Sequence, residues 1–366
     1  MERFLIVGLI HNSKEKEEKL SSLLELKELV RTYGGEVVDM IIQVRNKEDP
    51  AYHIGEGKVK EIACWEGFDT IIFDEPLKAA QIRNIEEITK RRVIDRRDII
   101  LDIFAKHART NTAKIEVELA RLKFLLPRLT GKGNELSRTG GGIGTRGPGE
   151  QKLEKDRRRI KERINYLEEK LKDIEKTLDI QRKRRSDLFT VALLGYTNVG
   201  KSTLLNALTK SKSYVDDKLF ATLDPLTRIG YTNNGKKYLL TDTVGFIKNI
   251  PHQLIASFKS TLKEASFVDL RLLVIDLSDE RYEMQIEESM NIMKMLGIDD
   301  KEFIYVFNKI DRVVDSLPLN YLKEKYSNSI FVSALRGDGL KELKDMIEEM
   351  ILRKEARYYN KISVRD

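Results

Sequence analysis

The 366-residue sequence has only one cysteine, one tryptophan and four histidines. Because Cys64 has no second cysteine to pair with, an internal disulfide framework and a cysteine-based zinc cluster are both excluded. A chain without disulfides is typical of a reducing compartment. No apolar run approaches the roughly 18 to 20 residues that a membrane-spanning helix needs. The amino terminus also lacks the cleavage site of a secretory signal. We therefore expect a cytoplasmic protein without a membrane span.

Charged residues are abundant, and their balance is basic. Asp, Glu, Lys and Arg make up 34% of the chain, and 66 Lys or Arg against 59 Asp or Glu give a formal net charge of +7. A basic excess favours anionic partners, and nucleic acid is the first candidate. The length is that of two or three domains.

Residues 1–108 alternate strand-like apolar runs with helical patterns. FLIVGLI at 4–10, EVVDMIIQV at 36–44, TIIFDEP at 70–76 and RVID at 92–95 read as strands, with amphipathic segments between them. This order predicts a small, mostly parallel α/β domain.

Residues 109–186 carry apolar side chains at heptad spacing on both sides of a glycine-rich stretch. Two amphipathic helices joined by a loop can bury their apolar seams only by folding back on each other, so we expect an antiparallel helical hairpin with residues 128–149 at its tip. The two predicted seams are Ile115, Leu119, Leu122 and Leu126, and Ile160, Ile164, Leu167, Leu171, Ile174 and Leu178.

Residues 187–366 return to alternating strands and helices, which predicts a doubly wound sheet. Asn234 and Gly235 lie between two strand-like runs and indicate a hairpin, so one edge strand should be antiparallel.

The strongest motif is GYTNVGKST, residues 195–203, placed between an apolar strand and an apolar helix. It fits the pattern G-x-x-x-x-G-K-S, in which Gly195 and Gly200 let the backbone wrap a phosphate chain. Lys201 supplies a full charge to the β- and γ-phosphates, and Ser202 should ligate magnesium. The alternative is an ordinary strand-to-helix turn, and the context of the motif weighs against it.

Further motifs follow in the order that a GTPase needs. DTVG at 242–245 ends a strand, so that Asp242 can hold magnesium through water and the amide of Gly245 can meet the γ-phosphate. Thr222 is placed to be the second protein ligand of magnesium, with Thr227 and Thr203 as weaker rivals.

NKID at 308–311 indicates the base. The Asp311 carboxylate can accept two hydrogen bonds from the edge of guanine, whereas adenine would leave it facing acceptors, so GTP is favoured over ATP. Lys309 would lie along the ring, and Ser333 and Ala334 would support the guanine carbonyl by a backbone amide.

The candidate site therefore has three overlapping groups of residues. The catalytic candidates are Lys201, Thr222 and Gly245. The metal candidates are Ser202, Thr222 and Asp242, with Mg²⁺ as the cofactor. The nucleotide contacts are expected from Gly195, Asn198, Val199, Gly200, Lys201, Ser202, Thr203, Phe220, Thr222, Asp242, Gly245, Asn308, Lys309, Asp311, Ser333 and Ala334.

Phe246 directly follows DTVG, where many signalling GTPases carry a glutamine that orients the attacking water. A phenyl ring cannot orient water by hydrogen bonding, so we expect slow hydrolysis until a partner reshapes the switch segments. Asn198 resembles the residue that helps to hold a potassium ion in some GTPases, and potassium is a further hypothesis for this site.

The second predicted helix of the hairpin concentrates the basic charge. Residues 152–185 contain 14 Lys or Arg against 8 Asp or Glu. A solvated helix surface and a flexible linker are the plain alternatives for the helix and its tip. The cations of the glycine-rich tip favour contact with RNA, which is read largely through shape and backbone. The RNA-binding candidates are Arg128, Lys132, Arg138, Gly141, Gly142, Arg146, Arg157, Arg158 and Arg159.

Taken together, these motifs resemble the HflX family of ribosome-associated GTPases. The resemblance runs through DPAYHIGEGKVKEI, VELARLKFLLPRLTGKGNELSRTGGGIGTRGPGE, GYTNVGKST and DTVGFI, and covers most of the chain. It implies an α/β domain, a helical hairpin and a GTPase domain that bind the large ribosomal subunit. It also implies that Arg138, Arg146 and the glycines between them contact ribosomal RNA, and that the GTP-bound protein separates stalled ribosomes under stress.

Two rival functions remain open on the sequence. One is a GTPase that helps to assemble the large subunit or modify RNA, and the other is an RNA-binding or remodelling module whose nucleotide is mainly structural. We expect the protein to be a monomer.

Overall fold

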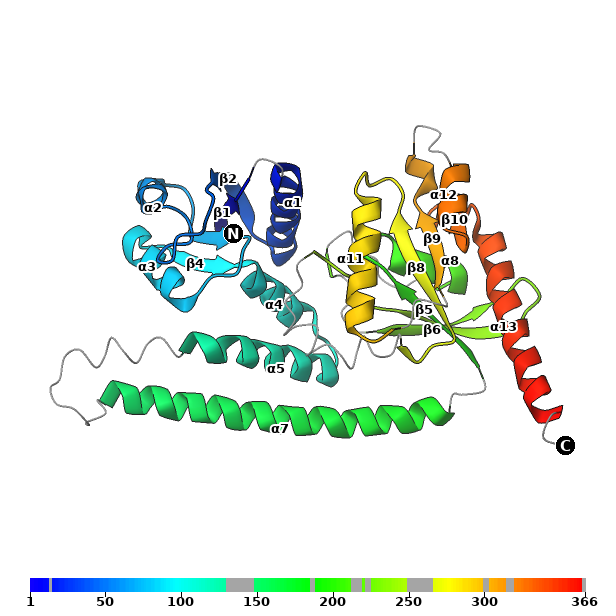
Figure 1. Ribbon diagram of the computed structural model, residues 1–366. Coiled ribbons are helices and arrows are strands. Elements are labelled where there is room, and N and C mark those ends of the chain that lie inside the picture. Colours follow the sequence, from blue (N-terminus) through cyan, green and yellow to red (C-terminus); the bar gives the residue numbers. More distant parts are fainter. Residues whose placement is uncertain are drawn as a thin grey trace. The chain divides into compact units, whose positions relative to one another are not determined.

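The structure, a computed structural model, shows two compact units (Figure 1). One is Met1–Asp173 and the other is formed by the described residues from Ile174 on, so that the long helix α7, Pro148–Arg184, contributes to both. The residues described are 1–12, 15–129, 148–184, 188–211, 219–220, 225–248, 266–298, 303–313 and 319–363.

The first unit contains a parallel sheet of four strands in the order β2-β1-β3-β4. The predicted parallel α/β fold of this segment is confirmed. The strands are β1 (Arg3–Ile10), β2 (Glu36–Val44), β3 (Thr70–Phe73) and β4 (Arg92–Asp95). The helices are α1 (Lys16–Tyr33), α2 (Glu56–Ala63), α3 (Ala79–Thr89) and α4 (Arg96–His107).

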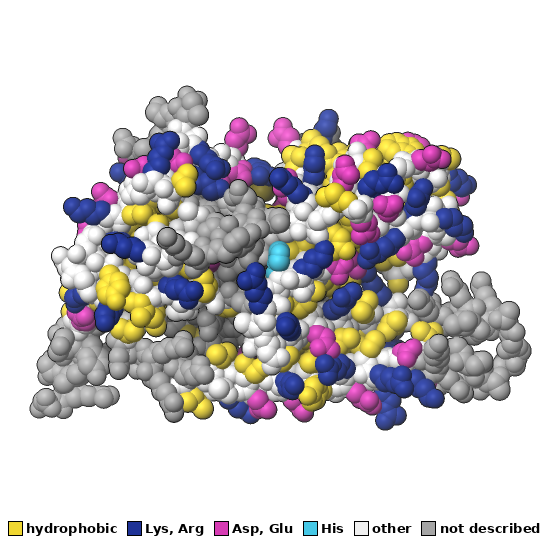
Figure 2. Space-filling model, turned by 180° about the vertical axis from the view of Figure 1, so that it is seen from behind, with side chains coloured by type: hydrophobic (Ala, Val, Ile, Leu, Met, Phe, Trp, Pro, Cys, Tyr) yellow, Lys and Arg dark blue, Asp and Glu magenta, His cyan; other side chains and the backbone are white. Residues whose placement is uncertain are grey.

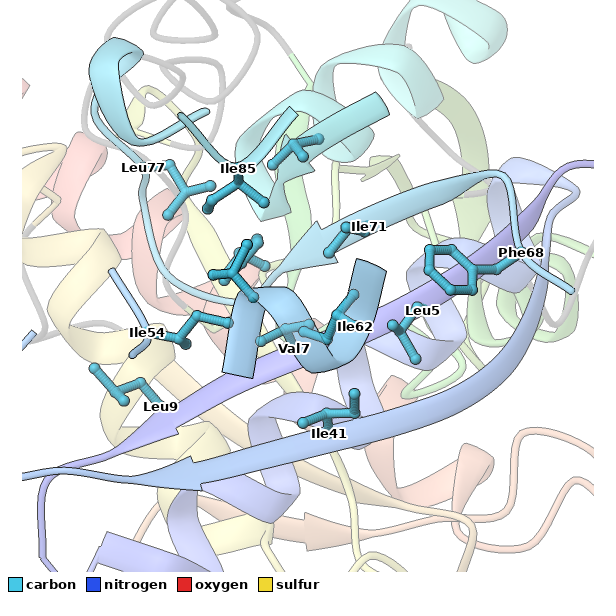
Figure 3. Packing of buried hydrophobic residues seen from close by; sticks show 13 residues of the cluster. Leu5, Val7, Leu9, Ile41, Ile54, Ile62, Phe68, Ile71, Leu77 and Ile85 are labelled. Carbon is cyan, nitrogen blue, oxygen red and sulfur yellow. The ribbon is translucent and has the colours of Figure 1, made fainter. Parts of the chain in front are cut away.

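Successive side chains of β1 point to opposite faces of the sheet, and β1 is apolar on both. Helices therefore cover both faces. Leu5, Val7 and Leu9 pack with Ile62 of α2 and Ile85 of α3 in one buried cluster (Figure 3). On the opposite face α1 lies so close that a Cβ placed on Gly8 would be 2.9 Å from a methyl carbon of Leu23.

A buried ion network joins α1, α4 and the end of β3. The guanidinium of Arg96, 2% exposed, donates to Asp74 at 2.8 Å and to Glu25 at 3.0 Å. Lys19 also pairs with Asp74, at 2.5 Å. The positive charges of Arg96 and Lys19 hold the pKa of Asp74 below its usual range, against the opposing effect of its burial.

Replacing Arg96 by Met should lower the free energy of unfolding of the first unit by about 3–5 kcal/mol, because it leaves the Asp74 carboxylate buried without its strongest partner. Trp65, the only tryptophan, packs against the core of this unit, so its fluorescence during urea unfolding reports the change. Arg92→Met is the matched control, because Arg92 is 51% exposed and pairs with Glu2 at the surface. Equal losses in the two variants would contradict the expected role of Arg96.

Two further helices, α5 (Asn111–Arg128) and α7, run in opposite directions (Figure 1). They are joined by ion pairs from Arg163 to Glu118 at 2.8 Å and from Lys123 to Glu168 at 2.7 Å. The residues of the two predicted seams are all buried or half-buried. Residues 130–147 of the predicted tip lie outside the described residues.

The second unit contains six strands in the order β10-β9-β8-β5-β7-β6. Only β6 is antiparallel, and it pairs with β7 through the predicted Asn234-Gly235 hairpin, so the predicted doubly wound fold is confirmed. The strands are β5 (Phe189–Leu194), β6 (Leu226–Tyr231), β7 (Lys237–Asp242), β8 (Leu270–Asp276), β9 (Phe303–Asn308) and β10 (Ser329–Phe331).

Helices surround this sheet. The α8 helix packs on β5, β6 and β7 and also contacts α13, while α11 packs on β8 and α12 on β10. The helices are α8 (Lys201–Thr209), α11 (Tyr282–Met295), α12 (Leu319–Lys325) and α13 (Leu340–Ser363), with a short 3₁₀ turn at Ile310–Arg312. Among the helices described, none is both long and apolar enough to cross a bilayer.

Candidate nucleotide site

The phosphate loop connects β5 to α8 and needs glycine at both ends. Gly195 has φ +136°, and a Cβ there would lie 2.2 Å from the carbonyl oxygen of Val274. Gly200 has φ +94°, and a Cβ there would lie 2.4 Å from Nδ2 of Asn308. Side chains at either position would collide with β8 or β9, so the loop can pass close to both strands only as glycine. Gly200 also caps α8, whose first amides face the loop.

Lys201 is buried at the start of α8, with 7% of its surface exposed. Its Nζ donates to the carbonyl oxygens of Gly195 at 3.1 Å and Tyr196 at 2.6 Å. Burial lowers the pKa of this ammonium to about 8, although the charge of Asp242 acts in the opposite direction. A buried cation held mainly by neutral carbonyls is suited to an anionic ligand such as a phosphate chain.

Ser202 and Asp242 form the described part of the predicted metal site. The hydroxyl of Ser202 donates to Oδ2 of Asp242 at 2.6 Å, and Asp242 is fully buried at the end of β7. Hydroxyl and carboxylate oxygens suit magnesium, so these two residues fit the predicted ion. Thr222 lies outside the described residues. Of its rivals, Thr227 lies with its hydroxyl 2.9 Å from that of Thr241, and Thr203 is half-buried on α8.

The segment after Asp242 is attached to the phosphate loop by its main chain. The amide of Phe246 donates to Gly195 at 3.0 Å, and its carbonyl accepts from the amide of Thr197 at 2.7 Å. The Phe246 side chain is 1% exposed, so its ring belongs to the interior of the domain. A Cβ placed on Gly245 would lie 3.0 Å from Nζ of Lys201, so Gly245 adjoins the lysine that is predicted to bind phosphate.

The NKID residues are braced by side-chain contacts. Asn308 donates to the carbonyl of Val199 at 2.9 Å and accepts from the amide of Ala334 at 3.0 Å. Lys309 donates to the carbonyl of Asn198 at 2.8 Å and pairs with Asp276 at 2.7 Å. Asn308 and Lys309 thus connect the loop that is predicted to bind the base to the phosphate loop.

Asp311 accepts a hydrogen bond from the hydroxyl of Ser333 at 2.6 Å. This bond holds the pKa of the Asp311 carboxyl below its usual range. The carboxylate is therefore ionised and oriented, as recognition of guanine requires. In the structure the Ser333 hydroxyl contacts Asp311 and the Ala334 amide contacts Asn308. The support of the guanine carbonyl by a backbone amide of Ser333 or Ala334 stays a prediction.

Three candidates remain, of which Asn198 and Val199 belong to the phosphate loop and Phe220 precedes β6. Asn198 is exposed with φ +60°, Val199 is 1% exposed, and Phe220 is 2% exposed with φ +57°. The role of Asn198 in binding potassium stays a prediction.

The RNA-binding candidates that the structure describes differ in their surroundings. Arg157, Arg158 and Arg159 are exposed on α7, where Lys and Arg side chains alternate with Asp and Glu (Figure 2). Arg128, in contrast, donates to Asp98 at 2.9 Å and to Asp95 at 2.7 Å, and only 18% of its side chain is exposed. Arg128 therefore fastens the end of α5 to the start of α4. The other candidates lie outside the described residues: Lys132, Arg138, Gly141, Gly142 and Arg146.

Comparison with known proteins identifies the family. Residues 20–105, 107–185 and 190–309 match families described as GTP-binding GTPase N-terminal, GTP-binding GTPase Middle Region and 50S ribosome-binding GTPase. Over 357 residues the chain is 44% identical to GTPase HflX of Caldanaerobacter subterraneus subsp. tengcongensis, covering 96% of this chain and 81% of that protein. The chain belongs to the HflX family of GTPases.

Further relatives support the HflX assignment. GTPase HflX of Escherichia coli (strain K12) is 40% identical over 357 residues, which cover 96% of this chain and 84% of that protein. A GTP-binding protein of the archaeon Sulfolobus solfataricus, solved in complex with GDP, shares the fold with a TM-score of 0.50 and 27% identity, over 96% of this chain and 99% of that one. As an HflX family member, the chain binds guanine nucleotides and hydrolyses GTP.

Two residues of this HflX site were missed on the sequence. Asp276 ends β8 and pairs with Lys309, and its place at the carboxyl end of a central parallel strand was the available signal. Thr197 lies inside the phosphate-loop motif, where the pattern G-x-x-x-x-G-K-S leaves the residue type open.

Proposed function

We propose that this HflX family member is a GTP-regulated factor that binds the large ribosomal subunit and promotes the dissociation of ribosomes, notably under stress. The observation that carries the proposal is the match of residues 190–309 to a family described as 50S ribosome-binding GTPase. The basic surplus of residues 152–185 supports contact with RNA. In this proposal residues 1–108 and the hairpin of 109–186 make the ribosomal contacts, and residues 187–366 bind and hydrolyse GTP.

GTP would act through two segments: the one before β6, which contains Thr222, and the one at the end of β7, which contains Asp242 and Gly245. Ser202 and Asp242 would hold Mg²⁺ together with Thr222, and the ion would neutralise charge on the β- and γ-phosphates. The Gly245 amide would meet the γ-phosphate, so that the triphosphate form orders these segments and hydrolysis releases them. The ordered form is the one that binds the ribosome.

Hydrolysis by the isolated protein should be slow, because Phe246 contributes a buried ring where a water-orienting amide would otherwise lie. The ribosome would accelerate the reaction by reshaping the switch segments. A potassium ion held by Asn198 is a second means of supplying positive charge.

Sedimentation of intact ribosomes tests this function. Ribosomes are incubated with the protein and GTP, GDP or a nonhydrolysable GTP analogue, and subunit peaks should grow with GTP and the analogue but not with GDP. Co-sedimentation with free large subunits alone would favour a role in assembly. Binding that ignores the nucleotide would favour an RNA-binding module.

Replacement of residues 138–147 by a serine linker should abolish the action on ribosomes and leave GTP affinity unchanged, because the segment carries Arg138 and Arg146 of the tip and lies apart from the nucleotide motifs in sequence. The matched control removes two exposed arginines elsewhere, as Arg353→Gln with Arg357→Gln on α13. Dissociation by the linker variant at the rate of the unchanged protein would contradict the role of the tip.

A further inference from the structure

Thr197 has a buried hydroxyl that lacks a hydrogen-bond partner. The residue is 7% exposed, and in the described part of the chain no group donates to or accepts from its Oγ1. Neighbouring hydroxyls differ in this respect, because Ser202 donates to Asp242 at 2.6 Å and Thr243 to the carbonyl of Leu193 at 2.7 Å. A buried hydroxyl without a partner costs about 1–3 kcal/mol, a cost that valine, of the same shape, would not carry.

The position of Thr197 places its side chain beside Gly245 and Lys201, the two residues expected at the reacting end of a bound triphosphate. A Cβ placed on Gly245 would lie 2.8 Å from both Cα and Cγ2 of Thr197 and 3.0 Å from Nζ of Lys201. Thr197, Gly245 and Lys201 therefore surround one small volume. The last two are the groups expected to hold the γ-phosphate, so Thr197 adjoins the same phosphate.

The main chain keeps Thr197 there. Its amide donates to the carbonyl of Phe246 at 2.7 Å, and the amide of Phe246 donates to Gly195 at 3.0 Å. Phe246 is thus fixed next to the γ-phosphate position while its ring offers no polar atom to water. Thr197, by contrast, has a hydroxyl without a hydrogen-bond partner among the described residues.

We infer that the Thr197 hydroxyl takes part in GTP hydrolysis, donating to a γ-phosphoryl oxygen and accepting a hydrogen bond from the attacking water. A hydroxyl can do both at once, because it has one donor hydrogen and two acceptor lone pairs. The water forms a new O–P bond, the bond from the γ-phosphorus to the bridging oxygen breaks, and the proton of the water passes to the phosphate product. Thr197 keeps its own proton and orients the water.

Single-turnover GTP hydrolysis by Thr197→Val and Thr197→Ser tests the inference. The valine variant should hydrolyse GTP at least about tenfold more slowly, because a group aimed at the transition state is lost. The serine variant should stay within about threefold of the unchanged protein, because it keeps the hydroxyl. Hydrolysis by the valine variant at the unchanged rate would overturn the inference.

Two further readouts separate this role from a structural one. GDP lacks the γ-phosphate, so its affinity should be the same in all three proteins. The nucleotide-free valine variant should melt no lower than the unchanged protein, because it buries no unpaired hydroxyl. If the valine variant lost GDP affinity and thermal stability together with hydrolysis, the hydroxyl would be structural and the inference would be wrong.

Discussion

Asp311→Asn should weaken GTP binding by about 10²–10³-fold, because one hydrogen bond to a charged acceptor is lost and the new amide group faces the amino group of guanine. The same change should strengthen binding of xanthosine triphosphate, whose ring carries a carbonyl in place of that amino group. Calorimetric titration of the unchanged protein and of the variant with each nucleotide measures the two effects. A misfolded variant would lose affinity for both nucleotides, so a gain in affinity for xanthosine triphosphate would show that the loss of GTP binding is not a folding defect.

Ser333→Ala is the graded control for this prediction. It removes the 2.6 Å hydrogen bond that orients Asp311 but leaves the carboxylate in place. The expected loss of GTP affinity is about threefold to tenfold, which is the net worth of one hydrogen bond. If Asp311→Asn bound GTP as tightly as the unchanged protein, the NKID motif would not select the base in this chain.

Features set by short-range spacing could be predicted from the sequence. EVVDMIIQV at 36–44 coincides with β2, and Asn234-Gly235 forms the hairpin that makes β6 antiparallel. Strand and hairpin signals of this kind depend on neighbouring residues only. The motifs around Lys201 and Asp242 likewise follow from strand-end positions, and the structure brings Ser202 and Asp242 into direct contact.

Features set by contacts between distant residues could not be predicted. Arg128 adjoins a basic glycine-rich segment, so its sequence context indicated RNA, but its partners Asp95 and Asp98 are 33 and 30 residues away. The guanidinium also lies 3.9 Å from the ring centre of Phe124. Nothing in the local pattern around Arg128 indicates which carboxylates the fold brings to it.

The same limit applies within the nucleotide site. The sequence predicts that Ser333 supports the base through a backbone amide, and only the fold shows that its hydroxyl also contacts Asp311. Asp276 was missed because its partner Lys309 follows β9, the strand that pairs with β8, and the sequence alone does not show this pairing.

Lys201→Met should weaken GTP binding by at least about 10²-fold at pH 7, because it removes the only full charge described inside the phosphate loop. The affinity of the unchanged protein should in addition depend on pH. Its Lys201 has a pKa of about 8 without nucleotide, and a bound triphosphate raises that pKa by favouring the ammonium form. Binding above pH 8 therefore takes up a proton, and affinity should fall by about 30-fold between pH 7 and pH 9.5.

The Met variant isolates this titration. Deprotonation of the guanine ring affects both proteins equally, so the difference between their pH profiles, measured with a fluorescent GTP analogue, belongs to Lys201. Parallel profiles would contradict a depressed pKa in the free protein.

Stability without nucleotide should change in the opposite direction. Because the folded pKa of Lys201 lies below the unfolded value, the unfolded chain binds more protons between pH 8 and about 10.5, and the stability of the folded state rises with pH across that window. Below pH 8 Lys201 is charged in the folded state, and burying this charge destabilises the fold. Lys201→Met should therefore raise the melting temperature of the nucleotide-free protein at pH 7 while it lowers the affinity for GTP. Lys201, held by two carbonyl oxygens, would gain an anionic partner in the γ-phosphate, and Thr197 would gain the hydrogen-bond partner that its hydroxyl lacks among the described residues. Bound GTP should therefore stabilise the domain more than GDP does.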